Sequence, residues 1–250
     1  MTSNTTKAQL QGDTRKPLKD EKTAQPTAPI SLTAVRLAIA AGITYQVLLL
    51  ALIFIRPDLD PSWHSISEWA IGRYGWIMTM AFLISAVSYV ALFVMLKSQL
   101  QGIIGRIGLG ILLICVIGTM GVGLFTTDPI DANELSTTGT LHIIFGTAAL
   151  MLLPFAALFI NLSLALKNTA WATARRVLLW TAGLPMLGWL GFTVYTAIFV
   201  VPLGDHAYGP GVNIGWPPRF AFWTYAAWLV ILAWQAIKAQ LMFRTLKQEK

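Results

Sequence analysis

Six long apolar segments constrain this chain more than any other feature of its sequence. The hydrocarbon core of a bilayer is about 30 Å thick, so a helix that spans it needs roughly 20 mostly apolar residues. Backbone polar groups in lipid must be hydrogen-bonded internally, which leaves helices or a closed barrel, and barrel strands alternate in polarity over about 10 residues. The continuous apolar runs therefore predict an all-α bundle of six membrane-spanning helices, at residues 32–55, 74–96, 107–127, 141–166, 177–201 and 220–237.

The basic residues mark one side of this bundle. The chain has 18 lysines and arginines and 11 acidic residues, for a net charge of +7. The amino-terminal segment, alternate loops and the carboxyl terminus hold all the basic residues except Arg56, Arg73 and Arg219. Because basic loops stay in the cytoplasm during insertion, the pattern predicts a multi-pass protein of the cell membrane with both termini cytoplasmic. The positive charge thus has a topological explanation, and nucleic acid is not an expected partner.

The chain divides into one membrane domain and two short tails. Residues 1–31 are polar, with little to bury, which predicts a disordered cytoplasmic tail. Residues 32–243 form the predicted six-span transmembrane domain, and residues 244–250 a short basic cytoplasmic tail. Cys115 is the single cysteine, so an intramolecular disulfide is excluded, and its place within a span predicts a core residue.

Glycines, prolines and tryptophans indicate how the helices pack. The third span carries repeated glycines, which allow close helix approach in lipid, so it is expected to be central. Pro154 and Pro185 fall inside spans four and five, where each frees a backbone carbonyl and favours a packing kink. Amphipathic rings prefer the membrane interface, which predicts an aromatic belt at Trp63, Trp69, Trp76, Trp216 and Trp223.

The titratable residues gather on the side opposite the basic loops. Loops held by a rigid scaffold commonly carry functional sites, so this predicted outer face is the candidate functional face. It receives all three histidines and most of the acidic residues, namely His64, His142, His206, Asp58, Asp60, Glu68, Asp128, Asp131, Glu134 and Asp205.

The densest polar cluster is residues 64–68, just before the second span. Ser65 and Glu68 have the spacing of a capping box, in which a hydroxyl and a carboxylate satisfy the first free N–H groups of a helix. Ser65 and Glu68 thus have two alternative roles, capping this helix or binding a ligand, and the capping role is favoured. His64 precedes the cap and has no such explanation, except as an imidazole that tolerates the interface.

Two further candidates lie where spans three and four meet. Asp128 follows the third span, where Pro129 ends the helix. His142 opens the fourth span, where a neutral imidazole can accept a proton or bind a metal. Only a short loop separates Asp128 from His142, so contact between them is sterically easy. The sequence predicts a ligand-binding site built from Ser65, Ser67, Glu68, Asp128 and His142.

Two catalytic interpretations use the same residues. His64, Asp128, His142 and His206 have the chemistry of a zinc site, and zinc with an open position would activate water. These residues come from separate elements without a local metal motif. A serine-hydrolase site needs a nucleophile, a base and an orienting acid in contact. Ser65 or Ser67, with a histidine and Asp128, satisfies that inventory.

The chain resembles the bacterial six-span membrane family called domain of unknown function 998. The resemblance rests on residues 65–68 before the second span, residues 123–128 closing the third, and Leu141 and His142 opening the fourth. It covers the membrane region and leaves out the amino-terminal tail. The resemblance implies this fold and topology and draws attention to Asp128 and His142, but it carries no reaction.

Three functions follow as hypotheses. The first is a non-enzymatic membrane protein that binds a small ligand or lipid headgroup in a polar pocket of the outer face, because ionisable groups at helix ends usually mark function. The second is a metal-assisted lipid hydrolase at the outer interface, with zinc as its cofactor. The third is a small-solute transporter, which would need a path through the mid-span polar groups Tyr45, Gln46, Thr119, Tyr195 and Thr196.

Overall fold

A computed structural model describes residues 29–248, apart from the side chains of residues 205–206 and 242–248. Residues 1–28 of the predicted tail lie outside this part. The described chain contains helices and no strand, and six helical segments are long and apolar enough to cross a membrane. The elements are α1 (Leu32–Ile55), η1 (Ile66–Ala70), α2 (Gly75–Leu96), α3 (Gly102–Leu124), α4 (Thr137–Lys167), η2 (Thr169–Ala174), α5 (Arg175–Thr181), α6 (Gly183–Tyr195), η3 (Thr196–Val200), η4 (Val201–His206) and α7 (Trp216–Gln248).

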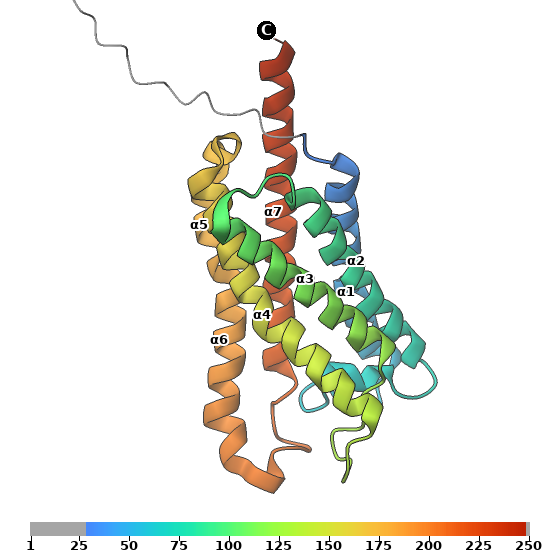
Figure 1. Ribbon diagram of the computed structural model, residues 1–250. Helices are drawn as coiled ribbons and strands as arrows, with labels where there is room; N and C mark the ends of the chain where they lie inside the picture. The colour runs from blue at the N-terminus through green and yellow to red at the C-terminus, as the bar shows by residue number, and fades with distance from the viewer. Residues whose placement is uncertain (1–28, 249–250) are drawn as a thin grey trace, which may run out of the picture.

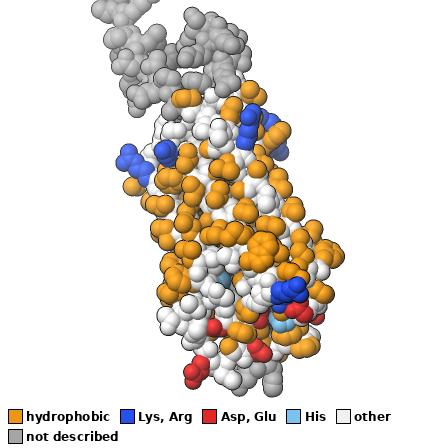
Figure 2. All heavy atoms as spheres, turned by 90° about the vertical axis from the view of Figure 1, so that its right-hand side faces the viewer, with side chains coloured by type: hydrophobic (Ala, Val, Ile, Leu, Met, Phe, Trp, Pro, Cys, Tyr) orange, Lys and Arg blue, Asp and Glu red, His pale blue; other side chains and the backbone are white. Residues whose placement is uncertain are grey.

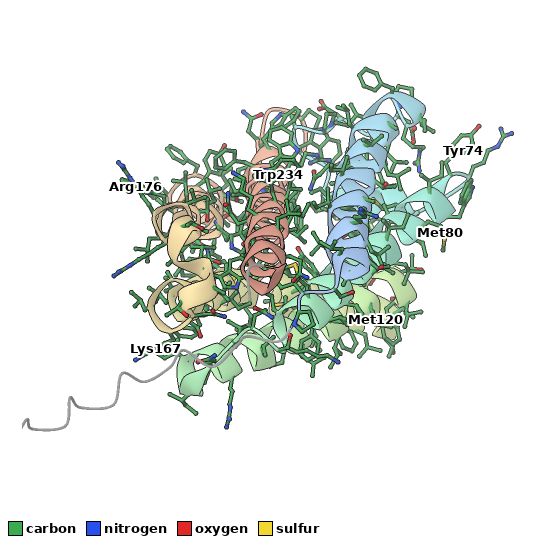
Figure 3. The ribbon with its side chains drawn as sticks, turned by 90° about the horizontal axis from the view of Figure 1, so that it is seen from above. Tyr74, Met80, Met120, Lys167, Arg176 and Trp234 are labelled. Atoms are coloured by element: carbon green, nitrogen blue, oxygen red, sulfur yellow. The ribbon has the colours of Figure 1, made fainter. Side chains whose placement is uncertain are left out.

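The helices form a bundle whose first helix begins, and whose last helix ends, at the same end (Figure 1). α3 and α4 pack side by side as a tilted pair across one face of α7 and α1 (Figures 1 and 3). We call the end with the termini the basic end. Arg176 points outward from it (Figure 3), and the acidic side chains gather at the opposite, acidic end (Figure 2).

Several helices extend beyond the apolar runs that predicted them. α4 begins at Thr137, four residues before the predicted start, because Ser136 caps it by accepting a hydrogen bond from the Gly139 N–H at 3.0 Å. His142 therefore lies in the second turn of α4, and the expectation that it opens the helix is wrong. α3 and α7 likewise continue into the polar residues at the basic end.

Proline has different effects on the fourth and fifth spans. The fifth span is divided, because α5 ends at Thr181 and α6 begins at Gly183. Pro185 lacks the N–H that would bond to the Thr181 carbonyl, and its ring crowds that carbonyl, so the predicted disturbance is confirmed there. α4 remains one helix with Pro154 inside it.

Glycines let α3 approach α4 closely, as expected. The expectation that this helix is central is wrong, because α3 packs mainly against α2 and α4, whereas α7 contacts α1, α4, α5 and α6. A Cβ atom on Gly118 would lie 2.7 Å from the Phe145 carbonyl oxygen, and one on Gly108 would lie 3.0 Å from Ile160 Cγ1. A Cβ atom on Gly121 would overlap the Phe145 ring. The backbones therefore meet where side chains would separate them.

A buried amide joins three helices near the basic half of the bundle. Asn161 of α4 is fully buried, and its Nδ2 donates to the Leu178 carbonyl oxygen at 2.8 Å. Its Oδ1 accepts from Trp228 Nε1 of α7 at 3.1 Å. Sequence analysis missed Asn161, although an amide inside an apolar run is the available signal. Its saturated contacts give it a structural role.

The predicted aromatic belt is correct in part. Trp76, Trp216 and Trp223 are 64%, 40% and 49% exposed near the acidic end, as interfacial rings should be. Trp69 is 2% exposed and donates from Nε1 to the Leu52 carbonyl oxygen at 3.1 Å. Its assignment to the belt is therefore wrong, because a buried partner satisfies its indole N–H.

The α3–α4 contact predicts different effects for two glycines of one helix. Gly121→Ala would force a methyl group into the Phe145 ring, so we expect a loss of roughly 1–3 kcal/mol of stability, as for overpacked cores. Gly110 has no atom within 4 Å of a Cβ position, so Gly110→Ala should leave stability unchanged or gain up to about 1 kcal/mol. Thermal unfolding in detergent compares the variants, and equal midpoints would contradict the close contact.

Candidate functional site

Glu68 ties together two loops at the acidic end. It lies in η1 and is 4% exposed. Its Oε2 accepts from the Ser65 backbone N–H at 2.7 Å, which is the carboxylate half of the predicted capping box. Its Oε1 accepts from the Ile130 N–H at 3.0 Å, across to the loop between α3 and α4. The carboxylate thus fixes both the start of η1 and its position against the neighbouring loop.

Arg219 holds the same loop from the other side. Its guanidinium is buried in α7, and Nη1 donates to the backbone oxygens of Pro61 at 3.0 Å, His64 at 3.1 Å and Gly215 at 2.7 Å. The guanidinium carbon also lies 4.5 Å from the centroid of the Trp69 ring, a cation–π contact. Arg219 therefore fastens the segment before η1 to α7.

Asp128 closes the loop that leads into α4. Its Oδ2 accepts from the Ser136 N–H at 2.7 Å, and its Oδ1 accepts from the Ser136 hydroxyl at 2.8 Å. Both oxygens thus support the residue that caps α4. The contact with His142 that the short loop would allow is not formed, since both ring nitrogens of His142 have other partners.

His142 instead pairs with Ser67. Nε2 of His142 lies 2.7 Å from Ser67 Oγ, and Nδ1 lies 2.7 Å from the Phe125 carbonyl oxygen at the end of α3. A carbonyl oxygen only accepts, so Nδ1 carries the proton in the neutral ring, and Nε2 accepts from the Ser67 hydroxyl. The Phe82 ring packs against the imidazole with centroids 6.0 Å apart. These contacts fix the ring's tautomer and orientation.

Ser67 and His142 lie on the wall of a cavity of about 450 Å³ between the helices. Ser65 lines it as well, whereas Glu68 and Asp128 are not among its lining residues. Most of the wall is apolar or aromatic. The wall also contains Tyr45, which the sequence offered only as part of a solute path. Tyr89 and Tyr225 line it too, and nothing in the sequence singled them out, because each lies in an apolar run and resembles a packing residue.

Exposed charges at the acidic end lie apart from this cavity. Arg56 donates to both carboxylate oxygens of Asp58, at 2.9 and 3.0 Å from Nε, and this hydrogen bonding holds the pKa of Asp58 below its usual value. Hydrogen bonds from Ser62 similarly lower the pKa of Asp60. Both acids stay ionised on the rim at neutral pH, and neither lines the cavity.

The four residues of the zinc hypothesis have separate surroundings. His64 stacks on Trp63 with ring centroids 3.7 Å apart, and its Nδ1 lies 3.2 Å from Glu68 Oε2. Within the part of the chain that the structure describes, no group of three or more His, Cys, Asp or Glu side chains could hold a metal ion. The side chain of His206 lies outside that part, so the zinc site stays a prediction.

The fold and the site define a class of polytopic all-α membrane proteins in which helix ends and loops enclose a largely apolar cavity. A hydroxyl–imidazole pair lies on its wall. A family model described as "Protein of unknown function (DUF998)" matches residues 38–235, so the chain belongs to that family, and the resemblance seen in its sequence is confirmed. No match was found among the curated proteins or the solved structures.

The clamp formed by Arg219 predicts a large effect of its removal. Arg219→Met keeps the apolar stem but leaves three backbone carbonyl oxygens, that of Gly215 buried and those of Pro61 and His64 part-buried, with one donor fewer, so we expect a loss of about 1–3 kcal/mol. Arg73 is exposed and also contacts an aromatic ring, that of Tyr74, so Arg73→Met should change stability by less than about 0.5 kcal/mol. Thermal melts in detergent distinguish them, and equal shifts would contradict the clamp.

Proposed function

We propose that this protein binds a neutral amphiphilic molecule, such as a diacylglycerol-like lipid, in the cavity beside Ser67 and His142. The observation that carries the proposal is the cavity itself. Ligand pockets are typically about 300–1,000 Å³, with mostly apolar walls and a few placed polar groups, and a cavity of about 450 Å³ with this wall fits that description.

The chemistry of the wall supports an uncharged polar group on the ligand. Among the described residues, the cavity is lined by hydroxyl groups and one imidazole but by no lysine, arginine, aspartate or glutamate. A phosphate or carboxylate buried there would lack a counter-charge, which is costly in a medium of low dielectric constant. An ester, amide or hydroxyl group would instead find hydrogen-bond partners at Ser65, Ser67 and His142.

The position of the cavity supports access from the lipid. Its lining includes Ile143 of α4 and Tyr208 of the loop before α7, which are 46% and 51% exposed. Phe192 of α6 lies on the same wall. An amphiphile could therefore slide between α4 and α6 with its chain in the bilayer and its polar group directed inward.

Within this proposal the predicted ligand-binding residues divide into two groups. Ser65, Ser67 and His142 contact the ligand, because they line the cavity. Glu68 and Asp128 act on the site indirectly, since their carboxylates hold η1 and the start of α4 in place. A further part of the proposal is orientation: the basic end faces the cytoplasm, and the cavity opens toward the outer leaflet.

Photo-crosslinking tests the binding site. In phosphatidylcholine nanodiscs, a diacylglycerol with a diazirine on one chain should label peptides of α4 and α6. Thr147→Trp places a large side chain in the cavity and should reduce labelling by about tenfold, equivalent to a loss of about 1.4 kcal/mol of binding free energy. Ile144 is 57% exposed and does not line the cavity, so Ile144→Trp is the matched control. Equal labelling of the two variants would contradict the proposal. So would competition by unlabelled phosphatidic acid that equals the competition by unlabelled diacylglycerol.

Cysteine labelling tests the orientation. In a Cys115→Ala background, Asn133→Cys and Ser98→Cys place single exposed thiols at the acidic and basic ends, respectively. Because basic loops stay inside, a membrane-impermeant maleimide applied to intact cells should modify Asn133→Cys, and Ser98→Cys only after lysis. The reverse pattern would invert the topology and remove the cavity from the outer leaflet.

A further inference from the structure

Among the described residues, three serines line the same cavity, Ser65, Ser67 and Ser85, but only Ser67 has an imidazole partner among the hydrogen bonds found. Ser67 Oγ lies 2.7 Å from His142 Nε2. Ser65, two residues earlier, lines the cavity too, and its backbone N–H is bonded to Glu68. The difference matters because a serine hydroxyl becomes a useful nucleophile when a neighbouring base can take its proton.

The imidazole is oriented as a general base requires. The Phe125 carbonyl oxygen accepts from Nδ1 at 2.7 Å, which leaves Nε2 free to accept the serine proton. In serine hydrolases a third group holds the histidine in this tautomer. Here a backbone carbonyl from the end of α3 takes that position, while Asp128 is occupied by Ser136.

We propose that Ser67 and His142 form a nucleophile–base pair that transfers or hydrolyses an acyl group of a neutral ester lipid. This inference rests on the proposed binding of such a lipid in the cavity. It names the reacting atoms: the ester carbonyl carbon lies at Ser67 Oγ, and the acyl chain extends along the apolar wall toward Phe82 and Phe222, which line the same cavity.

The reaction balances with water as the second substrate. Ser67 Oγ attacks the ester carbonyl carbon, and its proton passes to His142 Nε2. The ester C–O bond breaks, and the leaving alcohol takes that proton, which leaves an acyl group on Ser67. Water then attacks the acyl carbon while His142 accepts its proton and returns it to Ser67 Oγ, so that a fatty acid and the free enzyme result.

A covalent probe tests the nucleophile without the natural substrate. In phosphatidylcholine nanodiscs, Ser67 should displace fluoride from a dodecyl fluorophosphonate and form a phosphonyl adduct, mapped to Ser67 by mass spectrometry. Ser98→Ala, which changes an exposed residue outside the cavity lining, should label like wild type. Ser67→Ala should not label, and His142→Gln should slow labelling by at least about 100-fold, the usual contribution of a general base. An adduct on another residue, or undiminished labelling of Ser67→Ala, would overturn the assignment.

A cysteine pair keeps the test decisive if Ser67→Ala fails to fold. In the Cys115→Ala background, Ser67→Cys should react with iodoacetamide at least about tenfold faster than Ser65→Cys, because an imidazole favours the thiolate. His142→Ala should abolish the difference. Equal rates would leave the pair as a packing hydrogen bond only and overturn the inference.

The two proposals fail in different ways. Cavity labelling by the diazirine lipid without any phosphonyl adduct would remove the chemistry and keep the binding site. A phosphonyl adduct on Ser67, together with diazirine labelling that Thr147→Trp does not reduce, would remove lipid binding in the cavity and, with it, the ester-lipid substrate.

Discussion

The absence of water from hydrocarbon governs this structure, because every polar group between the helices must find its partner within the protein. Backbone groups meet the requirement by forming six helices. Two buried side chains show how it is met: Asn161 bonds across to Leu178 and Trp228, and the guanidinium of Arg219 bonds to three backbone oxygens. Burying a polar side chain between helices costs free energy unless it is hydrogen-bonded. Its hydrogen-bond partners therefore indicate whether it stabilises the fold or remains available for chemistry.

By this criterion the acidic end contains both kinds of residue. Glu68, Asp128 and Arg219 use their polar atoms on loops and helix starts, so they hold η1, α4 and α7 in register. Their charged groups bond to backbone atoms and do not line the cavity. What they position is the junction at which Ser67 meets His142. The charged residues are therefore the framework, and the neutral pair is the part of this junction that lines the cavity.

The sequence predicts the helices well because long apolar runs have one solution in a bilayer. It also predicts the capping role of Glu68, whose signal is local. It does not predict the Ser67–His142 pair, since those residues are 75 positions apart on separate elements, and either serine satisfied the same inventory. The Asp128–His142 contact that the short loop would allow is not formed, because Asp128 bonds to a nearer partner, Ser136. Trp69 is not part of the aromatic belt, because its ring packs against Arg219 and its indole N–H donates to the Leu52 carbonyl oxygen.

A backbone carbonyl behind His142 suits a cavity whose wall is largely apolar. A carboxylate in that position would stabilise the imidazolium better, but it would need its own solvation or a counter-charge whenever the ring is neutral. The Phe125 carbonyl sets the tautomer and adds no net charge. In the proposed reaction, its dipole would offer less stabilisation to the charged ring formed during proton transfer, so the pair should turn over more slowly than a triad with a carboxylate. An adduct trapped on Ser67 is consequently a more sensitive measure of this chemistry than product release.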